Sequence, residues 1–150
     1  MKLTRAQLET LVEQARRDAP NETCGLIGGR EGRAAGIYPL DNVDDRPRVR
    51  YMAEPHQLLR AMREIEETRG EEVLAIYHSH PASPAFPSPT DVERAFYPEA
   101  VYIIVSLMNR EMTQVRGFRI QEARVAEETL EILEEDDHEQ ARTHSRRHSS

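Results

Sequence analysis

The sequence lacks the features that mark several common protein classes. It has a single cysteine, Cys24, so an internal disulfide framework is excluded and a reducing, cytoplasmic compartment is expected. No apolar run approaches the length that crosses a bilayer, and residues 1–11 contain no apolar signal-peptide core. The net charge of −7 argues against a broad basic surface. We therefore expect neither a membrane nor a nucleic acid as a partner.

Polar and apolar residues are unevenly distributed along the 150 residues, which are enough for one domain with a buried core. We expect the folded domain to cover residues 1–132. Residues 134–150 contain one apolar residue, Ala141, which is too little to order a segment, so residues 133–150 are predicted to be a flexible tail. The tail offers three candidate metal ligands, for which a solvated tail is the simpler interpretation: His138, His144 and His148.

The spacing of apolar residues predicts a mixed α/β domain whose sheet is mixed, largely antiparallel and flanked by helices. Helices are predicted from Thr4 to before Pro20, from Pro55 to Gly70, and from Pro89 to about Phe96. The predicted strands are Glu22–Gly29, Ala34–Leu40, Val49–Met52, Val73–Tyr77 and Val101–Val105, followed by a terminal hairpin of Gln114–Ile120 and Ala126–Ile132.

The stretch from His78 to Asp91 carries the clearest functional signal. His78 and His80 are two residues apart at the end of a predicted strand, so both side chains point to the same side. Residues 81–89 contain four of the nine prolines, which stiffen the loop that leads to Asp91. Two imidazoles and one carboxylate are the ligand set of a catalytic zinc that keeps its fourth position for water.

Ser88 and Asp91 also have a purely structural interpretation. In this interpretation Ser88 is a helix N-cap, Pro89 is the first helical residue and Asp91 is an acidic residue in the first turn. Capping does not explain two histidines on one face of a strand before a stiff loop. The two interpretations are compatible, because Ser88 can cap the helix while its hydroxyl faces a metal site.

A hydrolytic zinc site also needs a general base and a donor to the developing oxyanion. Ser88 is a candidate donor. Glu22, at the start of the first long strand, is the best placed base by its order in the chain, but spacing leaves Glu54 and Glu93 nearly as good. Cys24 is interpreted as a small buried strand residue, because nothing in the sequence positions a histidine against it.

This set of residues resembles the JAMM (MPN+) family of zinc metalloproteases. The resemblance implies a cytidine-deaminase-like JAMM/MPN fold with one Zn²⁺ per chain, bound by His78, His80 and Asp91. It implies that Glu22 is the general base and later the proton donor to the leaving amine, and that Ser88 stabilises the tetrahedral intermediate. The pattern is His-Ser-His, seven residues, Ser, two residues and Asp, with an upstream Glu before Cys-Gly-Leu: Glu22, Cys24–Leu26, His78–His80, Ser88 and Asp91.

The resemblance also implies a class of substrate. Family members hydrolyse peptide or isopeptide bonds, commonly after the C-terminal Gly-Gly of a ubiquitin-like protein. The short chain resembles the compact prokaryotic branch, and within it the enzymes that release cysteine or another adduct from a ubiquitin-like sulfur-carrier protein. Such a carrier is the expected partner, with its extended tail added beside the sheet edge. We interpret Asp41–Arg48 as one wall of the tail groove, although an ordinary surface loop fits as well.

Two other functional classes are open at this stage. A non-catalytic MPN-type binding or assembly module would keep the metal for structure and close its coordination with a fourth protein ligand. A small-molecule zinc hydrolase or deaminase is the other, but the Pro-Cys-x-x-Cys motif of zinc deaminases is missing. The sequence leaves open the identity of the carrier, the leaving amine, zinc against another divalent metal, and monomer against homodimer.

Overall fold

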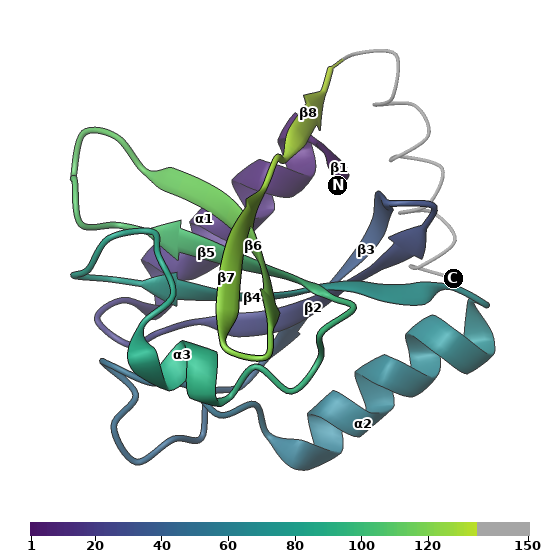
Figure 1. Ribbon diagram of the computed structural model, residues 1–150, viewed down its shortest axis with the longest axis horizontal. Coiled ribbons are helices and arrows are strands. Elements are labelled where there is room, and N and C mark those ends of the chain that lie inside the picture. Colours follow the sequence, from purple (N-terminus) through teal and green to yellow (C-terminus); the bar gives the residue numbers. More distant parts are fainter. Residues whose placement is uncertain (135–150) are drawn as a thin grey trace.

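The computed structural model of the protein describes residues 1–134 and shows one mixed sheet with helices against both faces (Figure 1). The strand order is β7-β6-β5-β4-β2-β3-β1-β8. Four of the seven neighbouring pairs are antiparallel and three are parallel, so the predicted fold class is confirmed. The elements are β1 (Lys2–Thr4), α1 (Arg5–Asp18), β2 (Cys24–Arg30), β3 (Arg33–Leu40), α2 (Pro55–Arg63), the π-helical turn η1 (Glu64–Thr68), β4 (Glu72–His80), α3 (Pro89–Glu93), β5 (Val101–Ser106), β6 (Gln114–Gln121), β7 (Arg124–Glu128) and β8 (Glu131–Leu133).

β4 lies at the centre of the sheet, between β2 and β5. Every residue of β5 is buried, as are the last six residues of β4, which suits the continuous apolar runs of both segments. β4 pairs antiparallel with β2 and parallel with β5, so backbone hydrogen bonds hold it along both edges. This double pairing makes the C-terminal end of β4 a rigid support for side chains.

Alternate residues of β4 face two separate hydrophobic cores. On one face, α1 packs in the core that contains Tyr77. On the other face, α2 packs in the core that contains Ile76. His78 and His80 follow Ile76 at intervals of two, so they lie on the face covered by α2 and α3.

The N-terminus is held by a capping box and by a strand that periodicity did not predict. The Thr4 hydroxyl accepts a hydrogen bond from the Gln7 backbone N–H (3.1 Å), and the Gln7 side chain accepts one from the Thr4 N–H (2.8 Å). The unpredicted strand, β1, pairs in parallel with β3 and with β8. The expected terminal hairpin therefore ends at Glu128, and β8 leaves it to join β1. Strands of three residues are too short to show a period of two.

Residues 41–54 contain no strand, so the strand expected at Val49–Met52 is wrong. The segment contains a single bridge, between Asn42 and Ala53. Its other backbone groups are bonded partly to one another in short turns and partly to side chains, and neither kind of bond leaves a regular pattern for sequence analysis to detect. The helix expected to reach Phe96 ends earlier, at Glu93.

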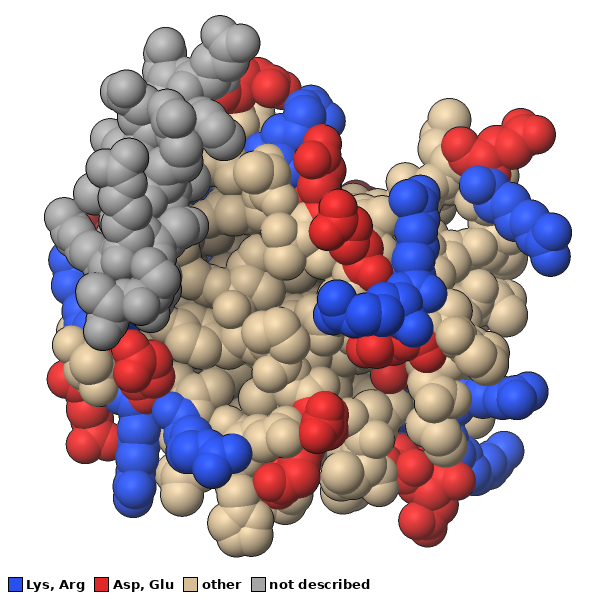
Figure 2. All heavy atoms as spheres, turned by 180° about the vertical axis from the view of Figure 1, so that it is seen from behind, with Lys and Arg blue, Asp and Glu red and all other residues tan. Residues whose placement is uncertain are grey.

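Residues 135–150 of the expected tail, with its three histidines, lie outside the described residues, whereas Leu133 is the last residue of β8; the domain boundary stays a prediction. Within residues 1–134, no helix is long and apolar enough to span a membrane. The face shown in Figure 2 carries acidic and basic side chains of the described residues around a broad uncharged area. Basic side chains do not gather into one patch on that face.

Candidate metal centre and active site

His78 and His80 end the central strand with both side chains buried, at 1% and 3% exposure. Their ring Nε2 atoms are 3.1 Å apart, which places the two imidazole edges against each other. Ser79, between them, points to the opposite side. Its hydroxyl accepts a hydrogen bond from the Thr23 N–H (2.7 Å), which ties the end of β4 to the chain entering β2.

Asp91 reaches the two histidines from the first turn of α3. One oxygen, Oδ2, lies 3.1 Å from His78 Nε2 and 3.0 Å from His80 Nε2. Three atoms that usually donate lone pairs to metals therefore form a triangle with sides of 3.0–3.1 Å. Around an ion with bonds of about 2.0–2.1 Å, tetrahedral ligand atoms are about 3.3–3.4 Å apart. The triangle fits a zinc-sized ion after a small outward relaxation.

Ser88 forms a capping box with Asp91. Its hydroxyl oxygen accepts from the Asp91 N–H (3.1 Å), and its own N–H donates to Asp91 Oδ2 (2.9 Å). The structural interpretation of this pair therefore holds, and the same bonds aim Oδ2 at the histidines. Among the described residues, the Ser88 hydroxyl proton has no acceptor, which leaves it free to donate to another group.

Glu22 is the fourth member of the cluster. One of its carboxylate oxygens and the ligand nitrogens of His78 and His80 all lie within 4.8 Å of one another. Its side chain is only 4% exposed, and Oε1 has no hydrogen-bond partner among the described residues. Unlike Asp91, Glu22 has no hydrogen bond with the histidines, although one of its oxygens lies close to both of them. The cluster is compatible with a metal site whose fourth position is open.

The backbone of Glu22 is held on both sides by the segment 41–54. Its N–H donates to the Pro47 carbonyl (2.7 Å), and its carbonyl accepts from Asn42 Nδ2 (3.0 Å). Sequence analysis interpreted Asp41–Arg48 as a groove wall but assigned no role to Asn42. Their only signal was the polar composition of residues 41–48, which does not reveal long-range hydrogen bonds.

The alternative bases have other tasks. The Glu54 carboxylate caps α2 by accepting from the His56 and Gln57 N–H groups (2.8 and 3.3 Å). Glu93 is exposed at the end of α3. Cys24 is buried, and burial raises the pKa of its thiol to about 12, so it is not a nucleophile at neutral pH. Among the three carboxylates considered, only Glu22 lies in the cluster.

The pKa values of the two carboxylates in the cluster shift in opposite directions. Burial, opposed in part by His80, raises the pKa of Glu22 to about 8. Burial also lowers the pKa of His78, which favours the neutral imidazole that binds metals. Burial opposes ionisation of Asp91, but hydrogen bonds with the two histidines hold its pKa well below the usual range. Glu22 can therefore exchange a proton near neutral pH, while Asp91 stays ionised.

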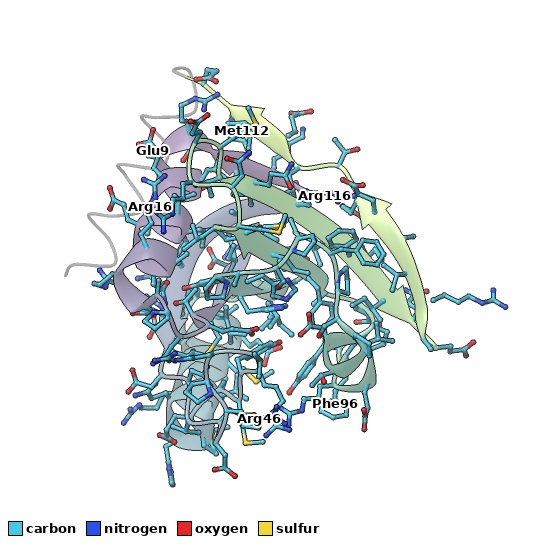
Figure 3. All side chains as sticks on the ribbon, turned by 90° about the vertical axis from the view of Figure 1, so that its left-hand side faces the viewer. Glu9, Arg16, Arg46, Phe96, Met112 and Arg116 are labelled. Atoms are coloured by element: carbon cyan, nitrogen blue, oxygen red, sulfur yellow. The ribbon has the colours of Figure 1, made fainter. Side chains whose placement is uncertain are left out.

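An apolar cavity of about 190 Å³ lies beside the cluster. Tyr51 belongs to its wall and also stacks on the His78 ring, so cavity and cluster share a boundary. Arg94 NH1 donates to Asp44 and to the Tyr51 carbonyl (both 2.9 Å), which holds the segment 41–54 against the end of α3. Figure 3 shows Arg46 of this segment and Phe96 after α3 at the same end of the molecule. The cavity lies between these elements and the sheet, and its further lining includes Leu26, Met52, Leu58, Ile76, Phe96 and Tyr102.

Comparison with known proteins identifies the family. A model of prokaryotic homologs of the JAB domain matches residues 4–121. The chain belongs to this family. The resemblance to the prokaryotic JAMM (JAB/MPN) branch is thereby confirmed. Membership of this family agrees with the expected hydrolase activity.

Individual relatives cover most of the chain. It is 37% identical to the CysO-cysteine peptidase of Mycobacterium tuberculosis over 130 residues, which are 85% of this chain and 88% of the relative. It is 38% identical over 96 residues to a desampylase of Haloferax volcanii, covering 63% and 68% of the two chains. The solution structure of DSY2949 from Desulfitobacterium hafniense matches with a TM-score of 0.80 and 37% identity, covering 89% and 93%.

Proposed function

We propose that the protein is a zinc-dependent peptidase or isopeptidase that hydrolyses the bond after the C-terminal Gly-Gly of a ubiquitin-like sulfur-carrier protein. Release of cysteine from a carrier–cysteine adduct is the reaction we expect. The observation that carries the proposal is the triangle of His78, His80 and Asp91 atoms beside a buried carboxylate, Glu22, that is outside the triangle. The relative named CysO-cysteine peptidase supports the choice of substrate.

In this proposal His78, His80 and Asp91 hold one zinc ion. The donor set fits, since one ionised carboxylate and two imidazoles form a usual open zinc site. When bound, zinc supplies Lewis acidity that makes water more acidic and polarises the scissile carbonyl. Glu22 accepts the proton of the attacking water and then passes it to the leaving amine. Its pKa near 8 without metal suits both directions of transfer.

Ser88 is proposed to donate its free hydroxyl proton to the oxygen that gains charge during attack on the carbonyl. The capping box fixes the Ser88 backbone and oxygen relative to Asp91, so the donor is positioned before the substrate binds. A preorganised donor stabilises the transition state without the cost of ordering it during the reaction.

The carrier tail is proposed to approach along the segment 41–54. Three large apolar side chains on this segment are about half exposed, at 48%, 57% and 49%: Val43, Val49 and Met52. Exposed apolar groups beside a cavity are typical of a surface that receives another protein. The predicted groove wall at Asp41–Arg48 belongs to the same segment, so the wall and the apolar contacts would act together.

The state of Glu22 argues against a non-catalytic module with a structural metal. A buried carboxylate with an unpartnered oxygen destabilises the fold, so its presence favours a functional role for Glu22. In a structural site Glu22 itself would have to serve as the fourth ligand, which would remove the free carboxylate that hydrolysis needs.

The proposal is tested with a carrier–cysteine adduct that ends in Gly-Gly-Cys. Zinc-loaded protein should release free cysteine and the carrier ending in Gly-Gly, which mass spectrometry detects as a loss of one cysteine residue. Removing the metal with a chelator should stop the reaction, and adding zinc back should restore it. Turnover that persists in the metal-free protein would refute the proposal, as would a zinc-loaded protein that cleaves no Gly-Gly adduct, whether its leaving group is cysteine or a lysine-linked peptide.

A further inference from the structure

The two histidines of the cluster are oriented by different means. His80 Nδ1 is 2.8 Å from the Pro84 carbonyl, so this ring can donate a hydrogen bond on the side away from the cluster. His78 Nδ1 is buried and has no hydrogen-bond partner among the described residues. Histidines that bind metals almost always donate a hydrogen bond from the second ring nitrogen, which sets the orientation of the ring. Another contact must therefore orient His78.

That contact is the ring of Tyr51. The Tyr51 and His78 ring centroids are 4.6 Å apart and the planes are inclined by 24°, which is a stacked pair. On its edge, His78 meets His80, with centroids 4.9 Å apart and planes at 62°. Rotation of the His78 ring about its χ2 angle would drive its edge into the Tyr51 face. The stack therefore limits the direction in which Nε2 points.

The backbone around Tyr51 is held by three side-chain hydrogen bonds, although it has no regular secondary structure. Arg94 donates to the Tyr51 carbonyl (2.9 Å). Asn42 donates to the Arg50 carbonyl and accepts from the Met52 N–H (both 3.0 Å). Consecutive residues on both sides of Tyr51 are thus bonded to other groups, and the backbone that carries the ring cannot move away from His78 without breaking these bonds.

The carboxylate of Asp44, whose side chain is 3% exposed, supports this arrangement. Its two oxygens accept hydrogen bonds from Arg50 Nε (3.1 Å) and from Arg94 NH1 (2.9 Å). Hydrogen bonds from the Arg46 N–H and from Arg94 lower the pKa of Asp44 to about 2, so it stays ionised over the range in which enzymes work. Asp44 therefore fixes Arg94, and Arg94 fixes Tyr51.

We infer that Tyr51 is a positioning residue for the metal site, which orients His78 through the face of its ring in place of the usual hydrogen bond. The inference rests on the proposed role of His78 as a zinc ligand. Tyr51 does not touch the metal position or the scissile bond in this account. It keeps Nε2 aimed at the point where His80 Nε2 and Asp91 Oδ2 also converge, before the metal arrives.

The test measures the affinity of the metal-free protein for zinc by competition with a chromogenic chelator. Tyr51→Ala should raise the dissociation constant by about 10- to 100-fold, the usual effect of removing a group that orients a ligand. Tyr51→Phe keeps the ring and should stay within about twofold of the unaltered protein. Tyr97→Ala is the matched control, because Tyr97 lines the same cavity but has no ring contact with either histidine.

The second readout is the visible spectrum of the Co²⁺-loaded protein, which reports the geometry of the ligands. Tyr51→Ala should weaken the absorption bands of the tetrahedral site, and Tyr51→Phe should restore them. If Tyr51→Ala does not fold, Arg94→Met removes the bond to the Tyr51 carbonyl while keeping the ring, and it should raise the zinc dissociation constant by a smaller factor.

Three outcomes separate the claims. The inference is supported if the zinc dissociation constant rises for Tyr51→Ala but not for Tyr97→Ala, and if Tyr51→Phe has the value of the unaltered protein. Equal zinc affinity and equal Co²⁺ spectra for the unaltered protein and Tyr51→Ala would overturn the inference while leaving the proposed function intact. Absence of zinc binding by the unaltered protein would overturn both.

Discussion

The site is built from two regions that are ordered in different ways. His78, His80 and Asp91 are carried by β4 and α3, where backbone ladders and a capping box fix each position. The facing segment, residues 41–54, has a single backbone bridge and is held by the side chains of Asn42 and Arg94. Regular elements place the proposed metal ligands. The irregular segment carries Tyr51, which stacks on His78, and it holds the backbone of Glu22. Changes in the two regions should therefore have different effects.

The largest effect is expected from breaking the regular region at Asp91. Asp91→Ala removes the proposed carboxylate ligand and one half of the capping box, so metal content should fall close to zero and hydrolysis should stop. Metal analysis of the purified variant and the adduct assay measure both. Glu93→Ala is the control, since that carboxylate is exposed on the same helix. A zinc-loaded, active Asp91→Ala protein would remove Asp91 from the ligand set.

Glu22 lies where the two regions meet, and its change should separate metal binding from turnover. Glu22→Gln keeps the shape of the side chain but cannot accept a proton, so kcat should fall by about 10²- to 10⁴-fold with zinc still bound. Glu54→Gln tests the alternative base and should leave kcat unchanged. A Glu22→Gln variant with normal turnover would show that another group takes the proton.

Ser88 is expected to show a smaller effect, confined to turnover and helix capping. Ser88→Ala should lower kcat by about 10²-fold through loss of the oxyanion donor, and it should lower stability by about 1 kcal/mol through loss of the N-cap. Ser88→Thr keeps the hydroxyl and serves as the control. If Ser88→Ala lost only the stability and kept its kcat, capping would be the whole role of this residue.

Breaking the irregular region should affect stability more than chemistry. Asn42→Ala leaves the Glu22 and Arg50 carbonyls and the Met52 N–H without their partner. A loss of about 2 kcal/mol in the free energy of unfolding is expected, because water can reach part of this segment and replace some of these bonds. Urea denaturation at neutral pH measures it, and an unchanged unfolding midpoint would show that the segment is held by other contacts.

A pH series tests the raised pKa of Glu22, the residue that lies where the two regions meet. The pKa of Glu22 rises from 4.5 to about 8 on folding, so the folded metal-free protein binds this proton more tightly than the unfolded chain does. That contribution to stability is fully present below about pH 4.5 and is lost as pH rises through about 8. Relative to Glu22→Gln, the unaltered metal-free protein should lose about 3–4 kcal/mol of unfolding free energy between about pH 5 and 8. Parallel pH curves for the two proteins would contradict a raised pKa.

The same division explains what could be predicted from the sequence. The apolar run ending in His78 and His80 indicates a central strand, and Ser88 to Asp91 indicates a helix start, because both signals are local. The bond between Arg94 and Asp44 spans 50 residues and has no local signal, so the segment was wrongly predicted to contain a strand. Tyr51 was overlooked for the same reason, since its partner, His78, is remote in sequence. Glu22 received its role only from the family resemblance.

The central claim is that one zinc ion is held by His78, His80 and Asp91. Anomalous diffraction from zinc-loaded crystals, recorded on both sides of the zinc absorption edge, tests it most directly. The account predicts one peak per chain, about 2.0–2.2 Å from His78 Nε2, His80 Nε2 and Asp91 Oδ2, with Glu22 outside bonding distance. A peak at another place, or a peak with the Glu22 carboxylate as the fourth ligand, would contradict it.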